Sequence, residues 1–428
     1  MKILFINPSS PPVPYGTGLQ VHNWGNIQAL QLNGHEIFLV MLSTDIQNKK
    51  EKIKQAKLEN KNLKLCTVVE IPRQQIRSLN SLSLSLIFKE FTESQKAKES
   101  YFINNDQSVS RKLEDLIIQS KAELIWYEDF YVALYDNWIS RNIPAVYNSH
   151  NNQSNLYKQK YLNDNQYGKT LGGRIRRIII QNRYKQLMKF EFKVQRKCNI
   201  MFTGNSDDAD LSRSKTINAV LRKVPVIGAD NEMLIKRKNY LNSLKKNNHK
   251  IKLVHLGALN GSFTSQSLLW FLSDVWKVFL EKINIIDIEL HIIGGGQPSD
   301  ELLKQINQPN IVYRGYVDNI WIELIDAFAM LIPGQIFTGV RIRMPVSFSM
   351  MVPVIGNKIS FQGMSDAKDR ESVLYAENPS QYLEAIKALY DNYSFYKKIC
   401  QNSKEIYDKN YSIDAASADI KRAFSSFV

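Results

Sequence analysis

Short apolar segments alternate with helical segments along nearly the whole chain, in two separate runs. The first run has apolar segments at residues 2–7 and 36–42, with a turn-rich loop and a helical pattern between them. Further apolar segments follow at 63–69, 124–127, 145–148 and 200–203. A repeat of strand, helix and strand builds a parallel sheet with helices on both faces. The first run therefore predicts a doubly wound α/β domain.

The second run predicts another domain of the same kind. Its strands are expected at 251–257, 288–293, 311–314, 329–332 and 353–355, and its helices at 265–280, 300–306 and 345–351. A chain of 428 residues is too long for one ordinary core. We therefore expect an N-terminal domain at 1–230, a polar, lysine-rich linker at 231–250 and a C-terminal domain at 251–410. A C-terminal helix at 411–428 is a candidate to complete the first domain.

The formal charge of +15 favours anionic partners, which include nucleic acid, an acidic membrane surface and phosphorylated ligands. Nucleic acid ranks last because no helix-turn-helix, RNA-binding or zinc-finger pattern is present. The cysteines Cys66, Cys198 and Cys400 lack the spacing of a zinc site or a disulfide framework. No apolar run approaches a membrane span, and residues 1–10 do not resemble a signal peptide, so we expect a cytoplasmic protein.

Several segments together resemble one family, the retaining GT-B glycosyltransferases often called "glycosyl transferases group one". These segments are PPVPYGTGLQVHNWGNIQALQLNGHEIFLV, IPAVYNSHNNQSNLYKQ, VHLGALNGSFTSQSLLWFLSDVW, ELHIIGGGQP, NIVYRGYVDNIWIELIDAFAMLIPGQIFTGVRIR and MMVPVIG. The resemblance implies the GT-B fold, in which two Rossmann-like, doubly wound domains face each other across a cleft that holds a nucleotide sugar.

Sugar transfer from a nucleoside diphosphate expels a diphosphate, which cations, backbone N–H groups and helix N-termini stabilise. The turn at Thr338, Gly339 and Val340 precedes a predicted helix, and its amides are candidates to face a phosphate. By resemblance, Arg341 and Arg343 stand where the family places basic residues beside the donor diphosphate. The alternative is that both arginines are solvated surface residues.

Two further candidates come from the first domain. By resemblance, Gly16 is the glycine that lets the backbone approach donor and acceptor, and His150 is the histidine that contacts the donor sugar near the reacting carbon. His150 follows a predicted strand, where open α/β sheets bind ligands. An ordinary turn glycine and a structural loop histidine are the alternatives.

The sequence departs from the family at Thr338 and Val346, where the family carries two glutamates that contact the donor sugar and the ribose. We therefore keep two hypotheses. The first is a retaining enzyme that moves a hexose from a nucleotide sugar to a lipid-linked or polysaccharide acceptor in cell-surface glycan synthesis. The second is a catalytically degenerate subunit that binds a partner protein or a glycan.

No metal or other cofactor is expected besides the donor substrate itself. The sequence Asp208-Ala209-Asp210 matches the metal-binding motif of a different glycosyltransferase fold. However, it follows Asn205-Ser206, which is typical of a helix N-terminus. We therefore interpret it as part of a helix start.

Residues 158–197 are strongly basic, with apolar residues at helical spacing, and predict one or two amphipathic helices. We expect these helices to bind an anionic membrane, so that the protein is peripheral on its inner face. The alternative is that Ile178, Ile179 and Ile180 simply pack inward.

Overall fold

The computed structural model describes residues 1–45, 47–72, 107–137, 139–161, 171–215, 217–244, 250–260, 262–282, 288–335 and 340–425. The chain folds into two compact units. Unit 1 comprises residues 1–14, 22–223 and 417–428, and unit 2 comprises residues 15–21 and 224–416. The end of the chain thus groups with unit 1.

The segment expected as a linker is a helix. Residues Asn231–Ser243 form α10, which begins after Asp230, whose side chain accepts a hydrogen bond from the Met233 amide. The side chain of Arg237 is fully buried in unit 2. The exposed face of α10 carries Lys236 and Lys238. The chain passes between the units at residues 14–15, 21–22, 223–224 and 416–417 instead.

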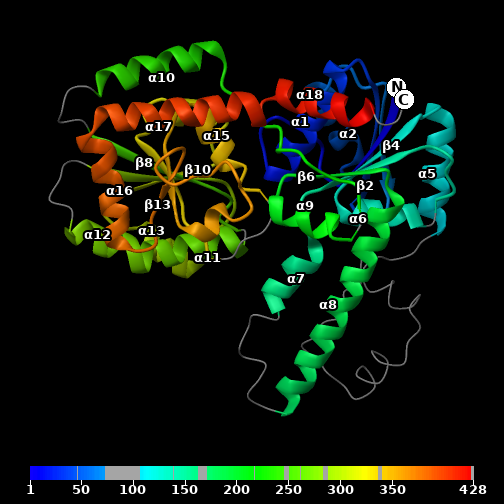
Figure 1. Cartoon of the computed structure of the whole chain (residues 1–428), viewed down its shortest axis with the longest axis horizontal. Helices are drawn as coiled ribbons and strands as arrows, with labels where there is room; N and C mark the ends of the chain where they lie inside the picture. Colours follow the sequence, from blue (N-terminus) through cyan, green and yellow to red (C-terminus); the bar gives the residue numbers. More distant parts are fainter. Residues whose placement is uncertain are drawn as a thin grey trace. The chain divides into compact units, whose positions relative to one another are not determined.

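Unit 1 contains a parallel sheet, which has seven strands among the described residues, in the order β3-β2-β1-β4-β5-β6-β7. The strands are β1 (Lys2–Pro8), β2 (Glu36–Ser43), β3 (Leu65–Glu70), β4 (Leu124–Glu128), β5 (Ala145–Ser149), β6 (Ile200–Thr203) and β7 (Ala219–Leu221). The helices are α1 (Gly18–Leu32), α2 (Lys49–Glu59), α5 (Gln107–Ser120), α6 (Phe130–Ala133), α7 (Gln153–Tyr161), α8 (Leu171–Lys197), α9 (Ser206–Arg213) and α18 (Ile413–Phe424). Figure 1 shows α8 as the longest helix of this unit, with α7 beside it.

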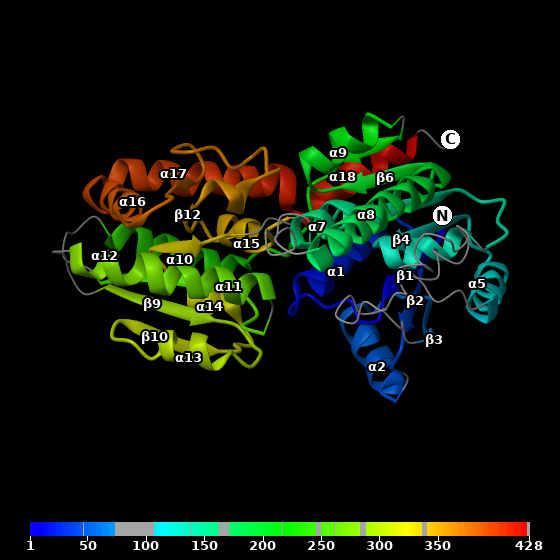
Figure 2. The same ribbon diagram turned by 90° about the horizontal axis from the view of Figure 1, so that it is seen from below.

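Unit 2 contains a second parallel sheet, in the order β10-β9-β8-β11-β12-β13. Its strands are β8 (Ile251–Leu256), β9 (Ile288–Ile293), β10 (Ile311–Gly315), β11 (Ala329–Ile332), β12 (Val354–Gly356) and β13 (Leu374–Tyr375). Besides α10, its helices are α11 (Ser262–Trp270), α12 (Lys277–Lys282), α13 (Asp300–Ile306), α14 (Ile320–Leu324), α15 (Arg343–Ser349), α16 (Pro379–Asp391) and α17 (Tyr393–Ile406). The sheet lies between α10 and α17 on one side and α11, α12 and α13 on the other (Figures 1 and 2).

The central strand β11 of unit 2 is buried on both faces, and its successive side chains point to opposite sides of the sheet. On β11, Ala329 and Leu331 join one apolar cluster, whereas Met330 and Ile332 join a second one. The continuous apolar runs of the sequence therefore correspond to strands covered by helices on both faces.

Helix α15 begins at Arg343, two residues earlier than the predicted start at Pro345. Proline is accepted within the first helical turn because the amides there have no intrahelical partner. Arg343 is consequently the first residue of the helix rather than part of the preceding loop.

Candidate functional site

Each sheet has a point where the strand order reverses, and open α/β sheets bind ligands there, beyond the carboxyl ends of the strands. In unit 1 the reversal lies between β1 and β4. Asn7 lies near the end of β1, Glu128 ends β4, and Asn148 and His150 lie at the end of β5. The polar residues of unit 1 are therefore gathered where the fold favours a ligand.

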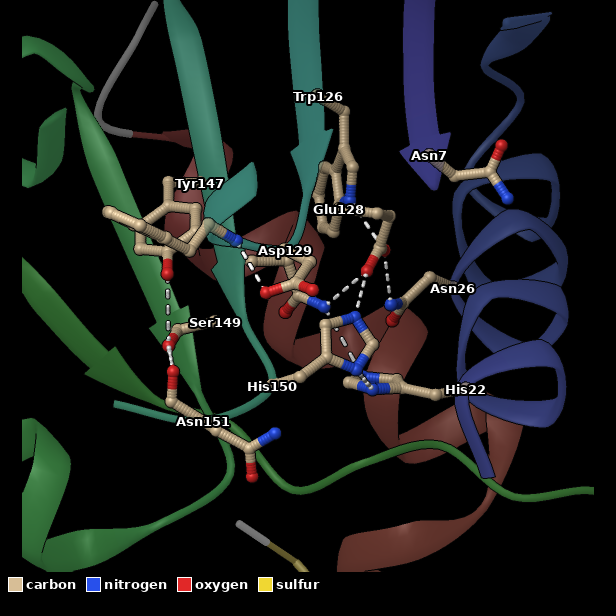
Figure 3. Close-up of polar contacts among 12 residues, drawn as sticks. Asn7, His22, Asn26, Trp126, Glu128, Asp129, Tyr147, Ser149, His150 and Asn151 are labelled. Atoms are coloured by element: carbon tan, nitrogen blue, oxygen red, sulfur yellow. Dashed lines mark hydrogen bonds and ion pairs between the residues drawn. The ribbon is translucent and has the colours of Figure 1, made fainter. Parts of the chain in front are cut away.

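Glu128 is the centre of this polar cluster, and its side chain is fully buried. Its Oε1 accepts hydrogen bonds from Asn26 Nδ2 at 2.6 Å and Trp126 Nε1 at 2.7 Å. Its Oε2 accepts from Asn148 Nδ2 at 2.8 Å and lies 2.7 Å from His150 Nε2 (Figure 3). A buried carboxylate needs such donors to replace water, and four groups surround this one.

Arg222 fixes the two amide side chains of the cluster. Its Nη2 donates to Asn26 Oδ1 at 2.7 Å and to Asn148 Oδ1 at 2.9 Å. Its guanidinium lies over the rings of Trp126 and Phe202. Burial lowers the pKa of Arg222 to about 10, against the opposing effect of nearby carboxylates. Arg222 is still a cation at neutral pH.

His150, a predicted site residue, has both ring nitrogens in contact with other side chains. Besides the Glu128 contact, its Nδ1 lies 2.9 Å from His22 Nδ1. Burial acts to lower the pKa of His150, but Glu128 and Asp129 outweigh it and raise that pKa above its usual value. Burial, His150 and Arg222 together hold the pKa of His22 well below its usual value. His22 is therefore neutral in the folded protein.

Sequence reasoning missed His22, Asn26, Glu128 and Arg222. His22 and Asn26 are four residues apart on α1, so they lie on the same face of that helix. Glu128 is the last residue of a fully buried strand, which is a position where a carboxylate signals a site. Arg222 carried no comparable signal because its partners are distant in the sequence.

In unit 2 the strand order reverses between β8 and β11, and glycines line the carboxyl ends of β8 and β9. A Cβ atom on Gly257 would lie 2.6 Å from Thr264 Cγ2, and one on Gly294 only 1.9 Å from the Gly257 carbonyl oxygen. Side chains do not fit at either position. The Gly294-Gly295-Gly296 segment after β9 thus packs its backbone closely against the loop after β8, at Gly257.

The loop after β11 is held at its start by Asn357, which follows β12. Asn357 Oδ1 accepts from the Gly334 amide at 2.9 Å, and its Nδ2 donates to the Gly334 carbonyl at 2.5 Å. This pair of bonds fixes the point from which the chain leaves β11 toward Arg341 and Arg343.

Arg343 lies at the reversal point of unit 2. Its Nη1 donates to the Leu256 carbonyl at 2.8 Å and lies 3.5 Å from His255 Nε2. Burial and the neighbouring Arg341 lower the pKa of Arg343 to about 9. Among the residues that the structure describes, no carboxylate forms an ion pair with Arg343. A partly buried cation in this setting favours an anionic ligand.

The remaining predicted residues are distributed as follows. Val340 and Arg341 lie just before α15, and burial lowers the pKa of Arg341 to about 10. Thr338 and Gly339 lie outside the described residues. Gly16 is exposed in the loop between β1 and α1, in the segment that groups with unit 2, and its φ of 159° is nearly extended. The structure thus groups Gly16, Val340, Arg341 and Arg343 in unit 2 and His150 in unit 1.

Val346 does not face an open site. Its side chain is 7% exposed and belongs to an apolar cluster of unit 2 that includes Met344 and Phe348. The position that the family resemblance assigned to ribose recognition is therefore part of the core.

The Asp208-Ala209-Asp210 segment lies in α9, as its helix-start interpretation predicts. Asn205 is the N-cap, and its Oδ1 accepts from the amides of Asp207 and Asp208. Among the described residues, no group of three or more histidine, cysteine, aspartate or glutamate side chains is arranged to hold a metal ion.

The basic segment forms α7 and α8. On α8, Ile179 and Ile180 are buried, whereas Ile178 is 53% exposed. Two of the three isoleucines therefore pack inward. In the described part of the chain, no helix combines the length and the apolar character needed to cross a bilayer.

Comparison with known proteins supports the architecture. Residues 250–392 match the family model described as "Glycosyl transferases group 1". No curated protein matches the sequence.

Solved structures match over the whole chain. Alr3699/HepE from Anabaena in complex with UDP is 13% identical, with a TM-score of 0.66 and 100% of both chains covered. A mutant of S. aureus TarM in complex with Fondaparinux, alpha-GlcNAc-glycerol and UDP is also 13% identical, with a TM-score of 0.66 over 99% of this chain and 100% of TarM. Sucrose-phosphate synthase (tll1590) from Thermosynechococcus elongatus is 10% identical, with a TM-score of 0.64 over 99% of this chain and 98% of that one. At these identities the match establishes the fold, and the chain has the expected GT-B fold of two Rossmann-like units.

Proposed function

We propose that this chain is a glycosyltransferase that moves a hexose from a nucleotide sugar to a glycan or lipid-linked acceptor. The observation that carries the proposal is Arg343, a cation without a described carboxylate partner, at the strand-order reversal of unit 2. The family match covers this region, and HepE and TarM have been solved with UDP. Retention of configuration and a role in cell-surface glycan synthesis are parts of the proposal that rest on the resemblance.

In the proposed reaction, the bond between the anomeric carbon and the diphosphate oxygen breaks, and the diphosphate leaves with both electrons. The acceptor hydroxyl forms the new bond to carbon and gives its proton to an oxygen of the departing diphosphate. Arg341 and Arg343 stabilise the charge that develops on the leaving group, which is the largest electrostatic demand of the step. The close packing of Gly257 and Gly294 lets backbone come near the same charge. No metal is part of the proposed step.

Calorimetry with UDP, ADP and GDP tests the donor half of the proposal. Arg343→Gln should weaken binding of the preferred nucleotide by roughly ten- to a hundredfold, because a charge-assisted contact contributes about 1.5–3 kcal/mol. Lys304→Gln, which removes an exposed cation of α13, is the matched control and should bind as the native protein does. Equal binding by Arg343→Gln and the native protein would refute the assignment of Arg343 to the diphosphate.

A catalytically degenerate subunit is the second candidate, and the burial of Val346 favours it, because no carboxylate stands there to bind a ribose. The two candidates differ in turnover. Release of nucleoside diphosphate from a nucleotide sugar supports the enzyme. Binding of the nucleotide sugar without release of nucleoside diphosphate, in the presence of any of a range of glycan acceptors, supports the degenerate subunit.

We further propose that α8 holds the protein on the inner, cytoplasmic face of an anionic membrane. The only acid of α8, Glu191, is fully buried, so the exposed charge of this helix is positive. Its exposed cations include Arg174, Arg177, Lys185 and Lys189. Each contributes about 1 kcal/mol at an anionic surface.

Co-sedimentation with vesicles of phosphatidylserine and phosphatidylcholine tests the membrane proposal. The double variant Lys185→Gln and Lys189→Gln should reduce binding to the anionic vesicles roughly tenfold or more. Binding that is insensitive to both lipid charge and ionic strength would exclude it. Lys236→Gln on α10, also an exposed lysine, is the control.

A further inference from the structure

The hydrogen bonds around Asn148 have only one possible direction. Arg222 carries donors and no acceptor, so the Asn148 atom that it contacts at 2.9 Å is the carbonyl oxygen Oδ1. The amide nitrogen Nδ2 then faces the Glu128 carboxylate at 2.8 Å. The second N–H of the same nitrogen points to His22 Nε2, which lies 3.3 Å away. Asn148 is therefore a donor to His22.

This direction determines the protons on both imidazoles. Because His22 Nε2 accepts and the ring is neutral, its proton is on Nδ1. That Nδ1–H donates to His150 Nδ1 at 2.9 Å, which therefore carries a lone pair. The proton of a neutral His150 is then on Nε2, where it donates to Glu128 at 2.7 Å. Figure 3 shows the two rings meeting edge to face beside Glu128.

We propose that His22 is a positioning residue that selects the Nε2–H tautomer of neutral His150 by donating a hydrogen bond to its Nδ1. Arg222 sets the direction of this chain through Asn148. The proposal deepens the proposed function, since His150 is the residue expected to contact the donor sugar. A sugar hydroxyl can bond to a ring nitrogen of His150 only by replacing His22 or Glu128 as its partner.

Protonation of His150 conflicts with this arrangement. A second proton on His150 enters at Nδ1, so His22 Nδ1 must become an acceptor and the His22 proton must move to Nε2. That nitrogen then faces the Asn148 donor, and one hydrogen bond is lost. The charged groups facing His150 are Glu128 and Asp129, which favour its protonation, and Arg222, which opposes it. His22 therefore acts with Arg222 against the protonation of His150, whereas Glu128 and Asp129 favour it and raise the pKa of His150 above its usual value.

Nitrogen-15 NMR on histidine-labelled native protein tests the proposal without a substrate, since the chain has only six histidines to assign. At pH 8 we expect His150 to carry its proton on Nε2 and His22 to carry its proton on Nδ1. In His22→Phe, the pKa of His150 should rise by about one unit or more, because the opposing N–H is gone. His22→Gln can still donate through its amide and should give a smaller rise.

The outcomes separate this proposal from the glycosyltransferase proposal. A proton on His150 Nδ1 in the native protein at pH 8 would overturn the positioning role, as would a His150 titration that His22→Phe leaves unchanged. His35→Gln, elsewhere in unit 1, should not alter the His150 signals. If the chain transfers sugar, His22→Phe should lower kcat at least tenfold and change the donor KM little, and His22→Gln should restore part of kcat. Absence of transfer in the native protein leaves the NMR result standing by itself.

Discussion

Arg237 gives the sharpest test of how α10 stabilises unit 2. Its guanidinium is fully buried and donates to four backbone carbonyls and one hydroxyl. Two of the carbonyls, those of Met350 and Met351, follow the last turn of α15. Arg237 therefore fixes the far end of the helix that begins at Arg343.

The expected cost of Arg237→Met follows from the groups left behind. The carbonyls of Ile325, Ala327, Met350 and Met351 lose a charged donor at distances of 2.7–3.1 Å. Each buried polar group left unsatisfied costs about 1–3 kcal/mol, whereas methionine avoids the cost of desolvating the cation. We expect the free energy of unfolding of unit 2 to fall by about 3–5 kcal/mol. Arg237→Lys should lose about half as much, because an ammonium cannot reach all these carbonyls.

Urea unfolding combined with hydrogen exchange measures the effect unit by unit, which matters because a chain with two units need not unfold in one step. Amides in 320–327 and 343–351 should exchange faster in Arg237→Met, and those of unit 1 should not change. Lys238→Met, at the exposed neighbouring position, is the control and should change stability by less than about 0.5 kcal/mol. If the two methionine variants are equally stable, the hydrogen bonds of Arg237 do not stabilise unit 2.

Three further changes have defined expectations. Burial and Arg343 lower the pKa of His255 to about 3, so its contribution to stability should be lost as pH falls below about 6.5. The difference in unfolding free energy between the native protein and His255→Gln should therefore shrink by about 3 kcal/mol between pH 6.5 and 4. The two proteins are compared because buried Glu191, whose pKa is raised to about 7, changes the stability of both with pH in the opposite direction, and this effect cancels in the difference. Met351→Gly relieves the strain of a left-handed φ of 54°, which costs about 1–2 kcal/mol, but it also removes a buried side chain that contributes about 2–5 kcal/mol. The loss is larger than the gain, so the variant should unfold at a lower urea concentration than the native protein. Val346→Glu should destabilise the protein and fail to tighten nucleoside diphosphate binding in calorimetry; a tenfold gain in affinity would mean that Val346 faces the ligand after all.

The strands were predictable because parallel strands covered on both faces appear in the sequence as uninterrupted apolar runs. Ile200–Thr203, Ile288–Ile293 and Ala329–Ile332 have the predicted bounds, and the other predicted strands differ by one or two residues at one or both ends. The short edge strands Ala219–Leu221 and Leu374–Tyr375 were missed, since three or two residues carry too little pattern. The α10 helix was missed because composition was given more weight than the buried stripe of Arg237 and Leu241.

The candidate site was only partly predictable, for a different reason. Arg341, Arg343 and Gly16 stand in recognisable segments, and the sequence alone was enough to select them. The cluster around His150 depends on Asn26, Glu128 and Arg222, which the fold brings together from positions up to 196 residues apart. No local pattern connects an asparagine in one helix to an arginine after the last strand of the sheet, so only the strand order reveals that they meet.

The two reversal points differ in chemistry, and this difference bears on how a donor would be recognised. In unit 1 the carboxylate of Glu128 is surrounded by its own donors, so it has little capacity to bind a hydroxyl of a ligand. In unit 2 the position of Val346 is apolar and buried, so no carboxylate is available there for a ribose. The cation Arg343 is the group whose described partners, a carbonyl and an imidazole, leave its charge uncompensated. Donor binding in this chain should therefore depend on the diphosphate more than on the ribose, and affinity should follow the number of phosphates more closely than the identity of the sugar.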